Sequence, residues 1–152
     1  IFCKSSEDLS PLQYAFRRRL TLLLAIMDLV ESGEITSPEI VLTEKLEETF
    51  SVEWNKYIGS PLVFKCKIAI PFWHMQNEPF YSLFLNSVEY LSDYSHPYSV
   101  KRLMEETYAE LDQDFFLLMQ DRKPRSEFRN VLVTTYLQGL HSDLQNSVGE
   151  GK

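Results

Sequence analysis

The stretch "RRRLTLLLAIMDLVESG", residues 17–33, contains the longest apolar run of the chain. Apolar residues recur in it at the spacing i, i+3, i+4, i+7, which is typical of the buried face of a helix. The residues at this spacing are Leu20, Leu23, Leu24, Met27 and Val30. Ser10 as a cap before Pro11 predicts the start of the helix, and Gly33 predicts its end. We therefore expect a long helix from Pro11 to about Ser32.

The composition is that of one globular domain. The chain has 152 residues, of which 44% are apolar, enough for a single core. The longest apolar run is interrupted by Thr21 and Asp28, and no run approaches the ~18 consecutive apolar residues of a membrane span. Cys3 and Cys66 stand alone beside three histidines, which argues against a zinc framework. We expect a cytoplasmic protein with free thiols and no membrane contact; a disulfide is the alternative.

The segment "ITSPEIVLTEKLEETFSVEWNKYIG", residues 35–59, predicts a second helix after a turn. Ser37 and Pro38 favour the turn, Thr43 is a candidate cap, and Gly59 is a candidate stop. The apolar residues on one face of this helix are Leu46, Phe50, Trp54 and Tyr57. Two helices joined by a short extended link are compatible with a helix-turn-helix or winged-helix arrangement.

The middle of the chain changes character. Residues 62–70, "LVFKCKIAI", alternate in part between apolar and basic, which predicts a strand with one buried face. Pro71 cannot donate a ladder hydrogen bond, so the strand is expected to end there. After the turn "QNEP", residues 76–79, the run "FYSLFL", residues 80–85, predicts a second strand. These features together predict a β-hairpin with an aromatic-rich bend.

That bend is a candidate binding surface. If Pro71 interrupts the ladder, the backbone bends and presents Phe72, Trp73 and His74 at the edge of the sheet. The alternative is that Phe72 and Trp73 are core residues and that His74 is simply solvated. Both interpretations are compatible with the sequence.

The last third of the chain predicts three helices. The first is expected in "SVKRLMEETYAEL", residues 99–111, and Asp112 is expected to cap the next, "QDFFLLMQD". Pro124 is expected to begin the last, "PRSEFRNVLVTTYLQ", which Gly139 would end. We therefore predict an α+β fold: a mainly helical single domain with a small β-hairpin or sheet, compatible with a winged-helix arrangement.

We find no pattern typical of an active site. The five glycines are scattered, so no phosphate-binding loop is expected, and no serine-nucleophile motif is present. Asp121 and Lys123 have an acid-x-lysine spacing, but they fall in a predicted turn and not on paired strands. His74, His96 and His141 are isolated in sequence. We predict no catalytic residue, no metal ligand and no cofactor, and whether the chain serves an enzyme is left open.

The net charge of −7 and the pI near 5.0 argue against general affinity for nucleic acid. A DNA site would therefore need a local basic patch. The candidate patches are Arg17 to Arg19, Lys65 with Lys67, and Arg122 and Lys123 with Arg125 and Arg129. Each of them is also compatible with an ordinary solvated face, which we favour for the last cluster.

Four segments resemble a known family in their order and spacing. They are "RRLTLLLAIMDLVESGEI", "VLTEKLEETF", "IPFWHM" and "YAELDQDFFLLMQDRKPRSEFRNVLVTTYL". Together they resemble the N-terminal recognition domain of bacterial restriction endonucleases of the His-Asn-His (HNH) type. That module is similar to the sulfur-binding domain, which recognises phosphorothioate-modified DNA. The resemblance spans residues 17–137.

The resemblance implies a DNA-recognition domain over residues 1–140, with residues 141–152 as a frayed tail or a linker to a separate nuclease domain. In such domains a proline before an aromatic residue helps to form an apolar pocket for the sulfur, and basic residues border it. The implied pocket residues are Ile70, Pro71, Phe72 and Trp73. The candidate DNA contacts are Arg17, Arg18, Arg19, Lys65, Lys67, His74 and Asn77.

Sulfur differs from the phosphate oxygen that it replaces in size, in polarisability and in weaker hydrogen bonding. An uncompensated buried polar group costs ~1–3 kcal/mol, so an apolar pocket could favour sulfur roughly ten- to hundredfold. We therefore expect a non-catalytic DNA-recognition module of a modification-dependent restriction system. Its expected partners are double-stranded DNA and a nuclease domain in the same or another chain. The alternatives are a protein-interaction module that uses the aromatic patch, and a winged-helix transcription regulator that reads DNA with residues 34–58.

Overall fold

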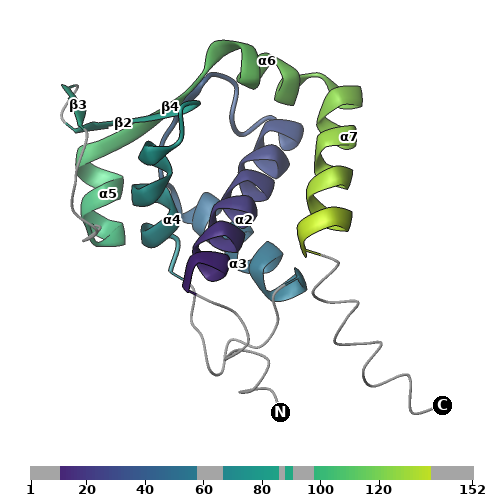
Figure 1. The fold of residues 1–152 in the computed structure, drawn as a ribbon. Helices are drawn as coiled ribbons and strands as arrows, with labels where there is room; N and C mark the ends of the chain where they lie inside the picture. The colour runs from purple at the N-terminus through teal and green to yellow at the C-terminus, as the bar shows by residue number, and fades with distance from the viewer. Residues whose placement is uncertain (1–10, 58–66, 86–87, 91–97, 138–152) are drawn as a thin grey trace.

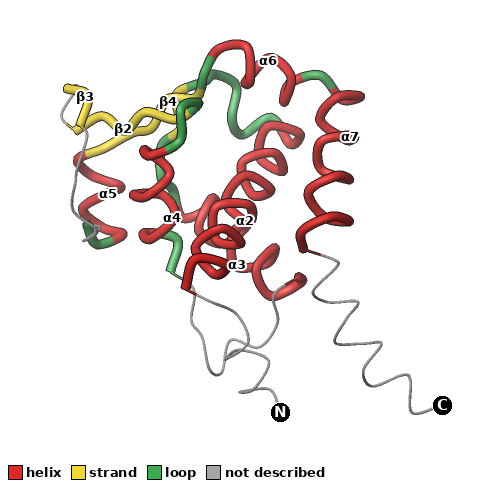
Figure 2. The backbone as a smooth tube through the Cα atoms, viewed as in Figure 1, coloured by secondary structure: helices red, strands yellow, loops and turns green. Residues whose placement is uncertain are grey.

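A computed structural model describes residues 11–57, 67–85, 88–90 and 98–137. In these residues the fold is α+β, mainly helical with a small antiparallel sheet, as the sequence predicts. Figure 2 shows the sheet at one edge of a body made of helices. None of the described helices has the length and apolar character needed to cross a membrane.

Helix α2, Pro11–Ser32, is the centre of the fold and has the bounds that the sequence predicts; the predicted cap, Ser10, lies outside the described residues. It packs against α3, α4, α6 and α7, and it lies between α4 and α7 in Figure 1. The predicted apolar face is buried, but so are the other sides of the helix: between Leu20 and Val30 only Asp28 is partly exposed. Gly33 ends the helix with a φ of 87°, a conformation that glycine adopts without strain.

Helix α3, Glu44–Tyr57, begins after the predicted cap. The backbone N–H of Leu46 donates to the Thr43 hydroxyl at 3.1 Å. Leu46, Phe50 and Trp54 are buried, which confirms the predicted apolar face. Glu53 is buried on the same helix, which the apolar pattern did not predict.

The sheet has the strand order β1-β4-β2-β3, and every pair is antiparallel. The strands are β1 Glu39–Ile40, β2 Tyr81–Leu85, β3 Val88–Tyr90 and β4 Thr107–Leu111. In register, Ala109 of β4 lies opposite both Ile40 of β1 and Leu83 of β2. The two-residue β1 sits in the connection between α2 and α3.

The hairpin predicted around Pro71 is wrong. Residues Ala69–His74 form helix α4, followed by the 3-10 turn η1, Met75–Asn77, so residues 68–70 belong to no strand. Pro71 lies in the first turn of α4, where the backbone N–H has no partner within the helix, and proline is tolerated there. The predicted strand "FYSLFL" exists as β2, but it pairs with β3 and β4.

The single helix predicted over residues 99–111 is also wrong. The helix covers only Val100–Glu106, as α5, and the chain continues directly as strand β4. Ser99 caps α5 by accepting the N–H of Arg102. Thr107 and Tyr108 favour extended structure, and pairing on both edges of β4 with β1 and β2 outweighs the helical propensity of the segment.

The last helices follow the prediction more closely. Asp112 caps α6, Gln113–Gln120, by accepting the N–H of Phe115 at 3.2 Å. Helix α7, Arg122–Leu132, begins two residues before Pro124, with Asp121 as its cap, and continues as a π turn, η2, Val133–Leu137. Other predicted features lie outside the described residues: Cys3, residues 62–66 with Lys65 and Cys66, Gly59, His96, Gly139, and residues 141–152 with His141.

Candidate nucleic-acid interface

Exposure along residues 67–77 follows a helical spacing. Seven residues of this segment are buried: Ile68, Ala69, Pro71, Phe72, Trp73, Met75 and Gln76. The exposed or partly exposed residues are Lys67, Ile70, His74 and Asn77. Residues three or four apart share one side of a helix, so these four residues form a single row, which we call the α4 stripe.

The α4 stripe begins just before the helix itself. The N–H of Ile70 donates to the carbonyl of Lys67 at 3.1 Å, so the helical turn already starts at Lys67. The stripe presents an ammonium, an apolar side chain, an imidazole and an amide in sequence. All four were candidate site residues on the basis of sequence. A strand would have placed Ile70 and Lys67 on opposite faces, and the helix aligns them.

The aromatic rings of α4 face the interior. Phe72 and Trp73 are 0% and 2% exposed, so the sheet-edge surface predicted for them does not form. The ring of Phe72 lies edge-on to that of Tyr81 at 6.0 Å, and the Tyr81 hydroxyl donates to the Phe72 carbonyl at 2.7 Å. Of the residues implied for a sulfur pocket, Pro71, Phe72 and Trp73 are therefore buried beneath the stripe, and Ile70 reaches the surface.

The arginines of α2 lie on the helix that packs against α4. Arg17, Arg18 and Arg19 are all partly buried. Arg19 Nη1 lies 3.1 Å from Glu78 Oε2, and Glu78 directly follows Asn77 at the end of the α4 stripe. This ion pair connects α2 with the turn after α4, two segments that the sequence analysis proposed separately as parts of a binding site. Because both side chains are partly exposed, its contribution to stability is small.

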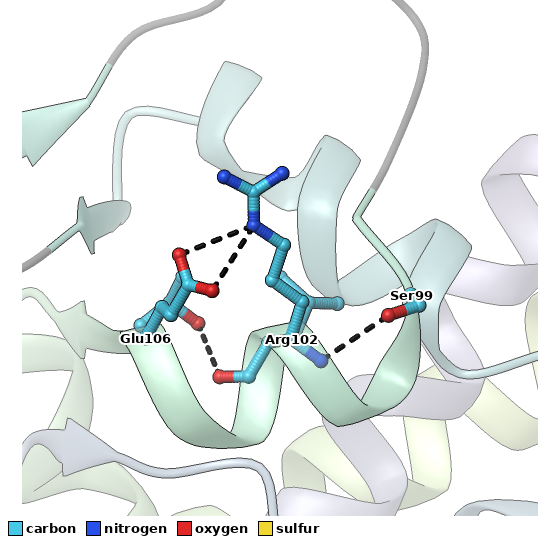
Figure 3. Close-up of polar contacts among 5 residues, drawn as sticks. Ser99, Arg102 and Glu106 are labelled. Carbon is cyan, nitrogen blue, oxygen red and sulfur yellow. Dashed lines mark hydrogen bonds and ion pairs between the residues drawn. The ribbon is translucent and has the colours of Figure 1, made fainter.

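A second arginine approaches α4 through aromatic contacts. The Tyr98 ring lies 4.6 Å from the Trp73 ring, and Arg102 Cζ lies 3.7 Å above the Tyr98 ring. Arg102 Nε also donates to both carboxylate oxygens of Glu106, at 3.1 and 3.2 Å (Figure 3). Our sequence reading did not single out Tyr98 or Arg102. Their i, i+4 spacing was the available signal, but such pairs are too common in sequences to be specific, and Tyr98 precedes the Ser99 cap of α5.

Part of the basic cluster near residue 125 has a structural role. Arg125 is buried, and its Nη1 donates to the carbonyls of Met119 and Gln120 at the end of α6. Asp121 accepts the N–H of Lys123 at 3.4 Å as the cap of α7, so the acid-x-lysine pair closes a helix start. Arg122 and Lys123 are exposed.

The fourth member of that cluster, Arg129, joins three helices. Its Nη1 lies 2.8 Å from Asp28 Oδ1 on α2, and its Nη2 lies 2.7 Å from Glu53 Oε2 on α3. Burial, followed by a hydrogen bond to Glu53, raises the pKa of Asp28 from 3.8 to about 7. Burial opposes ionisation of Glu53 too, but hydrogen bonds from Asp28 and Arg129 outweigh it and lower the pKa of Glu53. Arg129, Asp28 and Glu53, which we call the Arg129 cluster, thus include one ionised and one readily protonated carboxyl group.

The candidate interface is the α4 stripe, with Arg19 near its Asn77 end. In the part of the chain that the structure describes, no group of three His, Cys, Asp or Glu side chains gathers where it could hold a metal ion. What the surface provides chemically is charge, hydrogen-bond donors and one apolar side chain. The chain matches no protein-family model and has no significant match among curated proteins.

Proposed function

We propose that this chain is a DNA-recognition module that binds duplex DNA with the α4 stripe and the arginines beside it. The observation that carries the proposal is the alignment of Lys67, His74 and Asn77 on one side of α4. Lysine suits phosphate, whereas an amide and an imidazole can hydrogen-bond to base edges or to phosphate. The Arg19–Glu78 contact adds a guanidinium at the Asn77 end of the stripe.

The acidic body is compatible with this role. A net charge of −7 disfavours contact with DNA over most of the surface, so binding would be confined to the local basic patch. Repulsion between DNA and the acidic surface would orient the protein on DNA, and binding would weaken steeply with salt. The segment proposed as a winged-helix reader, residues 34–58, carries six glutamates against two lysines, which is unfavourable for phosphate contact.

The finer proposal is that the modified form of DNA is a phosphorothioate. It rests on the resemblance to the sulfur-binding domain, and Ile70 gives it a physical basis. Ile70 is the apolar member of an otherwise polar stripe, and the apolar residues that follow it, Pro71 to Trp73, are buried. A phosphate oxygen placed against this surface would lose water without gaining a donor, at a cost of ~1–3 kcal/mol, whereas sulfur would lose less.

In this proposal the chain recognises DNA and does not cut it. A nuclease domain, in the same polypeptide or in a partner, would supply cleavage, as in the restriction endonucleases that the sequence resembles. The cytoplasm, where such a system meets DNA, is the proposed location.

The test compares two duplexes of one sequence, with and without a single phosphorothioate link, by fluorescence anisotropy at several salt concentrations. Lys67→Ala should weaken binding of both duplexes equally and reduce the salt slope by about one unit, the loss of one phosphate contact. Ile70→Thr, which keeps the β-branched shape, should reduce the preference for sulfur and leave binding to the plain duplex nearly unchanged. Lys45→Ala, an exposed lysine on α3, is the matched control.

Three results would count against the proposal at different levels. No salt-dependent binding of either duplex would overturn DNA recognition. Equal binding of the two duplexes by the wild-type chain would leave DNA binding and remove the sulfur preference. An equal effect of Lys45→Ala and Lys67→Ala would show that general charge, and not the α4 stripe, controls binding.

A protein-interaction module is the second candidate, and one observation favours it. Helix α6 exposes Leu117 and Leu118 by 50% and 56%. Beside them, Phe115, Leu118, Met119, Pro124, Arg125 and Phe128 line an apolar cavity of about 130 Å³. Apolar contacts weaken little with salt, in contrast to phosphate contacts. Loss of partner binding in Leu118→Asn, with DNA binding intact, would support this second role.

A further inference from the structure

Arg102 is restrained on two sides although it lies at the surface. Its guanidinium stacks on the Tyr98 ring at 3.7 Å, and Nε donates to both oxygens of Glu106. Its side chain is still 50% exposed. An arginine held only by a surface ion pair samples many rotamers, whereas stacking and a two-oxygen contact together define the plane of this guanidinium.

The restraint leaves one edge of the guanidinium for a ligand. Because Glu106 occupies Nε, the remaining donors are those of the two terminal nitrogens. Figure 3 shows both terminal nitrogens directed away from Glu106. This pair of donors matches a ligand with two neighbouring acceptor atoms, such as O6 and N7 of guanine or two oxygens of one phosphate.

The position of Arg102 connects it to the α4 stripe. Tyr98 lies between the guanidinium and the Trp73 ring, and Trp73 directly precedes His74 in α4. The stack therefore joins the start of α5 to the end of α4 through ring contacts. We expect a ligand bound near His74 to reach the start of α5, because this stack holds the start of α5 against the end of α4.

We propose that Arg102 is a further DNA contact that binds two adjacent acceptors through its terminal nitrogens, with Tyr98 and Glu106 as positioning residues. This inference rests on the proposed DNA-binding function and extends it to α5. Restraint before binding matters because an arginine that is already ordered loses less side-chain freedom when it binds. A lysine has the same charge but lacks the planar pair of donors.

The experiment measures the dissociation constant of wild-type, Arg102→Lys and Arg102→Ala chains for the phosphorothioate duplex. A two-point contact should make Arg102→Ala about ten- to hundredfold weaker, with Arg102→Lys recovering only a small part of the loss. Arg122→Ala, an exposed arginine at the start of α7, is the control and should bind like wild type. Thermal unfolding of each variant checks that the fold is retained.

The source of the acceptors is identified with duplexes in which each guanine in turn is replaced by 7-deazaguanine, which lacks the N7 acceptor. A guanine contact predicts one position where the replacement weakens wild-type binding but does not weaken Arg102→Ala further. A phosphate contact predicts no such position and a salt slope about one unit shallower in Arg102→Ala.

The outcomes separate this inference from the function on which it rests. If the wild-type chain binds no DNA, the proposed function fails. If wild type binds and Arg102→Ala binds equally well, Arg102 is an ordinary surface ion pair and the inference alone fails. Arg102→Lys that binds like wild type would also overturn it, because charge without the planar pair of donors would then suffice.

Discussion

Arg129 and Arg102 both pair with carboxylates, and their surroundings differ. Arg129 contacts Asp28 and Glu53, which are 101 and 76 residues away in sequence, and Glu53 has a side chain only 5% exposed. Arg102 contacts Glu106, four residues away on the same helix, and both side chains are well exposed. The first cluster ties α2, α3 and α7 together, whereas the second sits on α5 alone. Similar pair chemistry therefore supports the fold in one place and remains accessible to a ligand in the other.

Burial explains the difference in energy. In a partly buried cluster, removal of the cation leaves carboxylates that neither water nor another cation can stabilise well. In an exposed pair, water replaces the lost partner, so the pair contributes little to stability. This explanation can be tested by measuring what each ion pair contributes to the free energy of unfolding.

The largest effect is expected for Arg129→Met, measured by urea unfolding at pH 7.5. Methionine keeps much of the apolar stem but leaves Asp28 and Glu53 without their shared cation. We expect a loss of about 3 kcal/mol, the low end for breaking a buried pair, because Asp28 is partly exposed.

The matched control is Arg102→Met, in which the same substitution is made in the exposed pair. We expect its free energy of unfolding to change by less than about 0.5 kcal/mol. Equal losses of unfolding free energy in the two variants would contradict this explanation, because burial would then not decide how much an ion pair stabilises the fold.

A smaller effect is expected at α4, which is held by rings and a neutral hydrogen bond. Tyr81→Phe keeps the ring against Phe72 but removes the hydroxyl that donates to the Phe72 carbonyl. We expect a loss of about 1.5 kcal/mol, typical of a buried hydrogen bond whose acceptor loses its donor. Burial raises the pKa of Tyr81 well above 10, so the hydroxyl remains a donor throughout the usual pH range.

Tyr108→Phe is the control for this substitution, because Tyr108 is partly exposed and stacks on Phe84. It should unfold like wild type. If Tyr81→Phe were as stable as wild type, the ring packing alone would hold α4 on β2, and the 2.7 Å contact would add nothing measurable.

Local signals predicted much of the fold. Gly33, Thr43 and Asp112 set helix boundaries through hydrogen bonds or φ values within a few residues, so α2, α3 and α6 could be predicted from sequence. The errors concern α4 and β4. Strand β4 exists because β1 and β2 pair with its two edges, and those partners lie far away in sequence. Alternation over residues 62–70 suggested a strand, although proline in a first turn is also compatible with a helix.

The candidate site was predictable as residues but not as a surface. Lys67, Ile70, His74 and Asn77 were each named from sequence, but only the helical spacing of α4 places them in one row. Arg102 was missed because a tyrosine and a glutamate four residues to either side of an arginine are a common sequence pattern. The contact of Tyr98 with Trp73, 25 residues earlier in sequence, makes that position distinctive, and it needs the tertiary structure.

The smallest effect concerns the pH dependence of the Arg129 cluster. In the folded chain Asp28 keeps its proton up to about pH 7, whereas the unfolded chain loses it near 3.8. Between these values the folded state binds more protons, so raising the pH reduces stability. Glu53, with its lowered pKa, contributes stability that is lost only as pH falls below its ordinary value of 4.5, so it is constant from pH 5.5 to 8.

Asp28→Asn should remove this pH dependence, because asparagine can still donate to Glu53 and accept from Arg129 without ever ionising. We expect wild type to lose about 1 kcal/mol or less between pH 5.5 and 8, since the Asp28 side chain is 28% exposed and water screens its charge. Urea unfolding of both chains at the two pH values measures the difference between them. Parallel pH profiles for the two chains would show that Asp28 ionises as an ordinary surface carboxyl, and the Arg129 cluster would then resemble the Arg102 pair more closely than its burial implies.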